Sequence, residues 1–384
     1  RQHGMDGENP WEEWANTAIT PDGTKKSGWL LETAPLPARV PKEHSETAWL
    51  TTRGIEFMDG QGDAPWLCHL SYIKPHWPYI VPAPYHDMYG PEHVIPVVRN
   101  DEERANAHPI LQAYYQHRFS KVFARDGVRE HVIPAYMGLI KQIDDQLGRL
   151  WKFLEERDLF DNTMIVFTSD HGDYLGDHWL GEKEMFHDIS VKIPLIIYDP
   201  SREADVTRGQ VSDALIEAID LVPTFVEFAG GEVRTNILEG QSLLPSLRDA
   251  NCKDDREIII SEYDYSVRKA RRILDQPIPD CKLIMAFDGR WKYVHVEGMA
   301  PMLYDLEIDP DECKDLGTDP TYDDQRHRLR EAIFEWSRKP SARVTATDAQ
   351  IAARAGGEFK RGIRIGFWDD EYIEEAKRDG ESGN

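Results

Sequence analysis

The chain has 384 residues, of which 40% are hydrophobic and 30% charged, a composition typical of a globular protein with enough apolar side chains for a sizeable core. Its 45 basic and 69 acidic residues leave a formal charge of −24, which argues against a nucleic-acid partner because such partners need a basic surface. No apolar run approaches the roughly 18 residues of a membrane-spanning helix, so we expect no membrane partner.

The four cysteines, Cys68, Cys252, Cys281 and Cys313, show no CxxC spacing. We interpret them as reduced thiols of a cytoplasmic protein, with two disulfides as the alternative. The chain begins with Arg1, so a signal peptide ahead of it stays a second possibility for its location.

The first 45 residues are rich in Gly, Pro and charged side chains without periodicity, which predicts loops. The next apolar residues, between positions 49 and 58, predict a helix. Residues Trp66 to Ile73 then predict a buried strand, which ends in Lys74-Pro75-His76-Trp77-Pro78-Tyr79. Taken alone, His76 is more typical of a packing or surface histidine, and we interpret Lys74 as a solvated loop charge.

Residues Tyr136 to Leu154 place apolar side chains at alternating steps of four and three, which predicts an amphipathic helix. The short apolar run Met164 to Phe167 then predicts a parallel strand buried on both faces. Asp170 and His171 follow it, where ligands bind in open α/β sheets. Asp-His-Gly alone is more typical of a turn after a strand than of a metal site. A second apolar strand is predicted from Ile193 to Tyr198.

The pattern changes near residue 251. Antiparallel strands are predicted at Ile258 to Tyr265, at Leu283 to Val296 with a turn at positions 288–290, and at Met302 to Leu306, followed by a helix near Leu329. We therefore expect three parts, an α/β domain at 1–250, a small α+β subdomain at 251–340 and a tail at 341–384. In the tail, Gly362 to Trp368 is compatible with an edge strand that contacts a second subunit in a homo-oligomer.

Four segments carry a family resemblance. They are TSDHG…LGDH…K…PL within residues 168–195, PHWPY at 75–79, DGRWKYV at 288–294 and LYDLEIDPDECKDL at 303–316. They resemble the sulfatase and phosphonate monoester hydrolase branch of the alkaline phosphatase superfamily over about residues 45 to 340. The resemblance implies an α/β fold, namely an alkaline phosphatase-like α/β/α sandwich, N-terminally incomplete, with a smaller C-terminal α+β subdomain.

The same resemblance implies the site residues. Asp170 and His171 would be metal ligands, Lys183 would grip the anionic oxygens of the substrate, and His76 would lie beside the sulfuryl or phosphoryl group. The implied cofactor is one divalent metal ion, Mn²⁺ or Ca²⁺, and a mixed oxygen and nitrogen ligand pair suits Mn²⁺ better. The implied partner is a small anionic ester. Without the resemblance, Lys183 is more typical of a solvated charge beside Glu182 and Glu184.

The chain also departs from the family. No cysteine or serine lies in the Cys-x-Pro-x-Arg or Ser-x-Pro-x-Arg motif whose nucleophile is oxidised to formylglycine, and the aspartate pair near the first strand is missing. We interpret the chain as the C-terminal part of a longer enzyme and expect it to be inactive alone.

We predict a metal-dependent hydrolase of sulfate or phosphonate/phosphate esters. The segments KPHWPY, HPILQAYY and SEYDYSVR favour a phosphonate monoester hydrolase or phosphodiesterase. An aryl- or choline-sulfatase is the first alternative. A non-catalytic binding protein on a sulfatase-like scaffold is the second.

Overall fold

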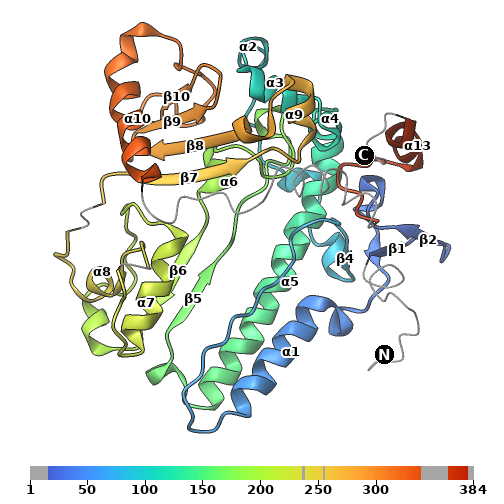
Figure 1. Cartoon of the computed structure of the whole chain (residues 1–384). Coiled ribbons are helices and arrows are strands. Elements are labelled where there is room, and N and C mark those ends of the chain that lie inside the picture. The colour runs from blue at the N-terminus through green and yellow to red at the C-terminus, as the bar shows by residue number, and fades with distance from the viewer. Residues whose placement is uncertain (1–15, 236–237, 254–255, 339–361, 379–384) are drawn as a thin grey trace.

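The computed structural model describes residues 16–235, 238–253, 256–338 and 362–378. These residues form a mixed α/β structure in which long helices lie below an antiparallel sheet (Figure 1). Within the described ranges, no helix is both long and apolar enough to cross a membrane. All four cysteines are free.

A 29-residue helix, α5 (Val128–Glu156), is the longest element, and α1 (Glu46–Asp59) runs beside it (Figure 1). The apolar stripe predicted from Tyr136 to Leu154 is confirmed, and the helix begins eight residues earlier at Val128. Polar groups also join the two helices, since Gln142 Nε2 donates a buried hydrogen bond of 2.8 Å to the Ser45 hydroxyl that caps α1. The apolar core on this side consists of Leu31, Ala34, Trp77, Tyr79, Val81, Tyr85, Val122, Phe123, Val128, Val132, Ala135 and Leu139.

The strand ahead of Asp170 differs from the prediction. Strand β5 (Ile165–Thr168) pairs antiparallel with β6 (Leu195–Tyr198), and its residues are half-buried or exposed. The expected parallel strand buried on both faces is therefore wrong for the described residues, because β6 returns along β5 and no other described strand joins this pair.

The predicted strand from Trp66 to Ile73 is also wrong. This segment is extended and alternates in exposure, with Leu67 71% exposed, but it forms no ladder with a described strand. The alternation that suggested a strand is real, yet a strand also needs a neighbour for its backbone hydrogen bonds.

The N-terminal segment, expected to be loop, forms a small sheet in the order β2-β1-β3-β4. Its strands are short because Gly, Pro and charged residues interrupt them: β1 (Thr17–Ile19), β2 (Lys25–Ser27), β3 (Pro37–Ala38) and β4 (Val81–Pro82). The parallel pairing of β3 with β4 anchors the chain directly after the PHWPY segment.

The C-terminal part agrees with the sequence analysis. Four antiparallel strands lie in the order β10-β9-β8-β7, and α10 (Asp323–Ser337) packs against the sheet (Figure 1). The strands are β7 (Ile259–Asp264), β8 (Lys282–Phe287), β9 (Trp291–Val296) and β10 (Met302–Asp305). The remaining α-helices in the described chain are α2 (Asp101–Ala105), α3 (Pro109–Tyr115), α4 (Arg118–Phe123), α6 (Asp188–Val191), α7 (Leu221–Phe228), α8 (Leu244–Arg248), α9 (Lys269–Leu274) and α13 (Asp370–Arg378).

One buried lysine ties the C-terminal sheet to the loop that follows Asp170. Lys292 of β9 is 1% exposed, and its ammonium lies 2.6 Å from Asp188 Oδ1 and 2.6 Å from Glu312 Oε1. The Glu312 carboxylate also accepts a hydrogen bond from the Asp188 amide. A buried cation between two carboxylates holds the sheet and the loop in one arrangement.

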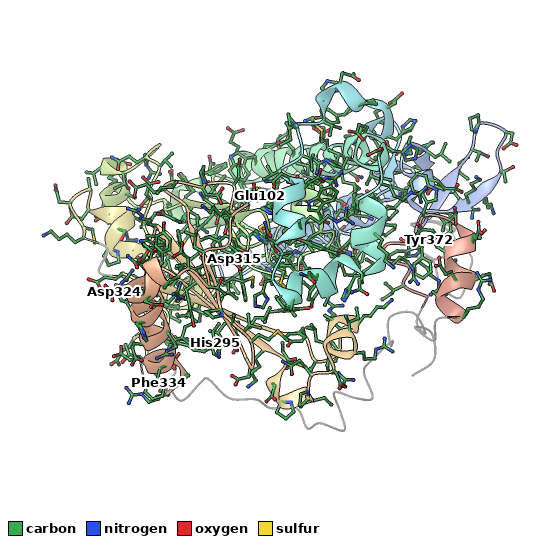
Figure 2. All side chains as sticks on the ribbon, turned by 90° about the horizontal axis from the view of Figure 1, so that it is seen from above. Glu102, His295, Asp315, Asp324, Phe334 and Tyr372 are labelled. Carbon is green, nitrogen blue, oxygen red and sulfur yellow. The ribbon has the colours of Figure 1, made fainter. Side chains whose placement is uncertain are left out.

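The expected edge strand from Gly362 to Trp368 is wrong. Phe367 of this segment is buried, and the Leu31 amide donates a 3.3 Å hydrogen bond to its carbonyl. The segment continues into α13, whose Tyr372 lies at the opposite end of the molecule from Phe334 of α10 (Figure 2). The predicted homo-oligomer stays a prediction.

Two glycines of α5 provide a matched test of this packing. A Cβ at Gly138 would lie 2.4 Å from the Tyr85 carbonyl oxygen, whereas a Cβ at Gly148 would meet nothing within 4 Å. We expect Gly138→Ala to destabilise the fold by about 1–3 kcal/mol because backbone has to move. Gly148→Ala should stabilise it by about 0.5–1 kcal/mol because alanine favours the helix. Chemical unfolding of both variants checks this, and stabilisation by both would contradict the packing of α5 on Tyr85.

Candidate active site

Asp170 and His171 follow β5 and present two ligand-type groups side by side. Asp170 Oδ2 lies 3.3 Å from His171 Nε2, and the Asp170 side chain is 84% exposed. His171 Nδ1 lies 2.7 Å from the Gly172 carbonyl, which only accepts, so Nδ1 carries the proton and Nε2 keeps a free lone pair. A ring held through one nitrogen with the other free is the usual state of a metal-binding histidine. The pair therefore fits a divalent ion held by one oxygen and one nitrogen from this chain.

Gly172 lets the loop after His171 fold back. Its amide donates a 2.7 Å hydrogen bond to the Ser190 carbonyl, and a Cβ at this position would lie only 1.9 Å from the Ile189 carbonyl oxygen. The glycine in Asp-His-Gly is thus required by a close backbone contact as well as by turn chemistry.

The loop that carries His76 reaches the same place. His76 Nδ1 donates to the Trp77 carbonyl at 2.9 Å, and Trp77 is anchored in the apolar core. Burial lowers the pKa of His76, its hydrogen bond to the Trp77 carbonyl raises it, and the charges of Lys183 and Lys74 lower it further. Lys183 and His171 come from other segments of the chain, yet both lie near enough to His76 to influence its pKa.

Lys183 is half-buried, not solvated. Its ammonium lies 3.9 Å from Glu182 Oε2, and its carbonyl accepts a 2.5 Å hydrogen bond from the Ser190 hydroxyl. Both neighbouring glutamates are buried, and burial followed by the charge of Glu184 raises the pKa of Glu182 to about 8. The two glutamates beside Lys183 are therefore not solvated, and the anion-binding role of Lys183 stays a prediction.

The interpretation of Lys74 as a solvated loop charge is also wrong. Its ammonium donates hydrogen bonds to the carbonyls of Pro78 at 2.6 Å and His76 at 3.3 Å. Burial lowers the pKa of Lys74 to about 7, while the charge of Glu46 opposes this shift. Lys74 is thus a further basic group beside His76. The available sequence signal was its position two residues before that histidine.

Tyr79 and Asp173 were missed. The Tyr79 hydroxyl donates a hydrogen bond to Asp173 Oδ2. This bond joins the loop that carries His76 to the loop that carries Asp170 and His171. Burial raises the pKa of Asp173 to about 7, whereas the Tyr79 hydrogen bond and the charge of Lys183 lower it. The only sequence signal was a carboxylate two residues after His171.

These groups define a class of site. Two ligand-type side chains for a divalent ion lie beside a histidine and two lysines, which is a set that binds and polarises an anionic ester. Residues 6–231 match the family model described as "Sulfatase", and residues 176–339 match "N-sulphoglucosamine sulphohydrolase, C-terminal". Because the first match covers more than half of the chain, this chain belongs to the sulfatase family.

Two proteins with similar sequences agree with the family assignment. The chain is 35% identical over 301 residues to the multifunctional alkaline phosphatase superfamily protein PehA of Trinickia caryophylli, covering 74% of this chain and 58% of PehA. It is 28% identical over 294 residues to an arylsulfatase of Clostridium perfringens, covering 75% of this chain and 57% of that relative. The chain therefore spans somewhat over half the length of these relatives.

Solved structures confirm the fold. The phosphonate monoester hydrolase of Silicibacter pomeroyi superposes with a TM-score of 0.76 at 25% identity, over 91% of this chain and 70% of that one. The enzyme of Agrobacterium radiobacter gives 0.71 at 31% identity, over 78% and 62%. The predicted resemblance and the alkaline phosphatase-like α/β fold with a C-terminal antiparallel sheet subdomain are thus confirmed.

The metal-type pair can be tested directly. We expect Asp170→Ala and His171→Ala each to lower the manganese bound by the purified protein, because each removes a direct ligand. Elemental analysis after loading with Mn²⁺ measures this, with His295→Ala in the C-terminal sheet as the control. Unchanged manganese in both variants would mean that the pair is only a turn after β5.

Proposed function

We propose that this chain supplies the metal-binding and anion-binding half of a hydrolase that cleaves phosphonate monoesters or phosphodiesters. The observation that carries the proposal is the pair of Asp170 and His171, 3.3 Å apart, with Lys183 near enough to His76 to lower its pKa. The KPHWPY segment and the similarity to two phosphonate monoester hydrolases support this ester class over a sulfate ester.

Each residue has a definite task in this proposal. Asp170 and His171 would hold one divalent ion, Mn²⁺ or Ca²⁺, which polarises the ester and lowers the pKa of the nucleophile. Lys183 would stabilise the charge that builds on the non-bridging oxygens in a site that excludes water. Lys74 would hold the His76 loop in place through its two carbonyl contacts.

The role of His76 depends on its proton. Its Nδ1 proton is committed to the Trp77 carbonyl, and its lowered pKa keeps Nε2 deprotonated near neutral pH. Neutral His76 accepts hydrogen bonds at Nε2. It becomes a donor to the leaving oxygen only when the anionic ester raises its pKa.

Two alternatives rest on specific observations. An aryl- or choline-sulfatase is supported by the arylsulfatase of Clostridium perfringens and the choline-sulfatase of Rhizobium meliloti, to which the chain is 28% and 29% identical. A non-catalytic binding protein is supported by the lack of the nucleophile motif at all four cysteines, where none has proline two residues later.

Turnover separates these alternatives. We expect the chain alone to hydrolyse no aryl sulfate, aryl phosphonate or aryl phosphodiester, because it supplies no nucleophile. Joined to a segment with the Cys-x-Pro-x-Arg motif and the aspartate pair, it should cleave the phosphonate with higher kcat/KM than the sulfate. Turnover by the chain alone that Cys68→Ala abolishes would overturn the first expectation, and a preference for sulfate would favour the sulfatase.

Lys183 and His76 can be tested in the same completed enzyme. Lys183→Ala should lower kcat/KM by roughly 10²-fold, the scale of losing one oxyanion-stabilising donor, with metal content unchanged. Lys192→Ala is the matched control, because its side chain is 79% exposed and only nine positions away. His76→Ala should harm substrates with basic leaving groups more than those with acidic ones.

The comparison of leaving groups in His76→Ala can also contradict a role of His76 as proton donor. An equal loss for both kinds of substrate would assign His76 to binding. Full activity in Lys183→Ala and His76→Ala would remove both residues from the site.

A further inference from the structure

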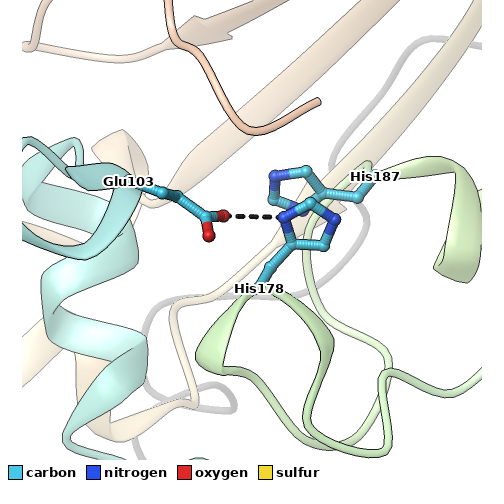
Figure 3. A group of neighbouring side chains, drawn as sticks. All are labelled: Glu103, His178 and His187. Carbon is cyan, nitrogen blue, oxygen red and sulfur yellow. Dashed lines mark hydrogen bonds and ion pairs between the residues drawn. The ribbon is translucent and has the colours of Figure 1, made fainter. Parts of the chain in front are cut away.

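The geometry points to a second divalent metal site, suited to zinc, formed by Glu103, His178 and His187 (Figure 3). It is separate from the Asp170 and His171 pair and shares no ligand with it. The proposal does not depend on which ester is cleaved.

The three side chains come from different parts of the chain and converge in the interior. Glu103 lies in α2, His178 in the loop between β5 and α6, and His187 directly before α6. They are 8%, 4% and 3% exposed, and one ligand atom from each lies within 4.8 Å of the others. His178 Nδ1 is 2.7 Å from Glu103 Oε1, as the dashed line in Figure 3 shows.

One buried atom has no partner without an ion. His187 Nδ1 lies 2.8 Å from the hydroxyl of Tyr174, while its Nε2 is buried and makes no hydrogen bond with the described residues. A buried polar group without a partner destabilises the fold. A bound ion would satisfy this nitrogen, and Tyr174 would orient the ring from the other side, as outer groups do for metal-bound histidines.

The rings of His178 and His187 set a condition on binding. They stack with centroids 4.0 Å apart and 12° between their planes, so their in-plane lone pairs lie in two nearly parallel planes and do not meet at one point. One ring therefore turns about its Cβ–Cγ bond, a soft torsion, to direct both nitrogens to one ion. The Glu103 contact of His178 Nδ1 is replaced by the ion, and the ring proton moves to Nε2, so the imidazole stays neutral.

The donor set selects the metal. Two imidazoles and one carboxylate, with a fourth position for water, match a four-coordinate zinc site. Calcium is disfavoured because it takes 6–8 oxygen ligands. His178 lies five residues before Lys183 and His187 four residues after it. An ion bound to both histidines and to Glu103 would therefore fix the loop that carries Lys183 against α2.

The alternative is a metal-free cluster, in which His178 donates to Glu103 and stacks on His187. That arrangement satisfies His178 and Glu103 but leaves His187 Nε2 unpaired. Zinc binding distinguishes the two.

The test uses the whole chain with Asp170→Ala and His171→Ala, which removes the first site. After chelation and dialysis, titration with ZnCl₂ followed by calorimetry and elemental analysis should show about one zinc per chain. Adding Glu103→Gln or His187→Ala should weaken binding by at least about tenfold, the lower range for losing even an outer-shell partner. His117→Ala is the matched control, because His117 is 4% exposed, also has an unpartnered Nε2 and lies outside the cluster.

Two further readouts keep the result interpretable. Glu103→Gln preserves side-chain size, and circular dichroism shows whether each variant is folded. X-ray absorption of the zinc-loaded chain with Asp170→Ala and His171→Ala should show two imidazole ligands. This measurement needs no substitution in the cluster itself. No zinc in the background protein, equal affinity in both folded variants, or an all-oxygen shell would each overturn the proposal.

Discussion

The contact between Gly172 and the backbone at Ile189 and Ser190 governs the geometry of the site. Only a glycine fits there, since a Cβ would lie 1.9 Å from the Ile189 carbonyl oxygen. The contact closes the segment between the metal-type pair and α6 into a loop that returns on itself. As a result Lys183, twelve positions after His171 in sequence, lies close enough to His76 to influence its pKa.

The returning loop is held by buried charge. Glu184 is paired with Arg268 at 2.9 Å, and Asp188 with Lys292. Both cations belong to the C-terminal part of the chain. Because each buried charge needs its partner, the C-terminal sheet helps to position the anion-binding loop. The proposed zinc ion would add one more such tie, on the side of α2.

The site also shows how a chain with a formal charge of −24 can attract an anion. Lys74 and Lys183 lie near His76, and burial raises the pKa values of Asp173 and Glu182 in the same region. Burial also lowers the pKa of Lys74 to about 7, so Lys183 is the main local cation. Attraction of an anion therefore depends on local charge and not on the net charge of the chain.

The sequence by itself determined the elements whose signal is local. The apolar periodicity of α5, the strands and turn of the C-terminal sheet, and the motifs that carry His76, Asp170, His171 and Lys183 were all predicted. Helices and hairpins satisfy most of their hydrogen bonds within a short segment, so their pattern is visible in the residues.

Tertiary structure alone decided what depends on distant partners. Three features follow from which segments lie side by side: the antiparallel pairing of β5 with β6, the burial of Lys74, and the lack of a described strand beside residues 66–73. The same holds for the hydrogen bond from Tyr79 to Asp173, which spans 94 positions of the chain. It also holds for the cluster of Glu103, His178 and His187, in which Glu103 and His178 are 75 positions apart. Pairing and desolvation are properties of neighbours in space, and the order of residues along the chain does not specify those neighbours.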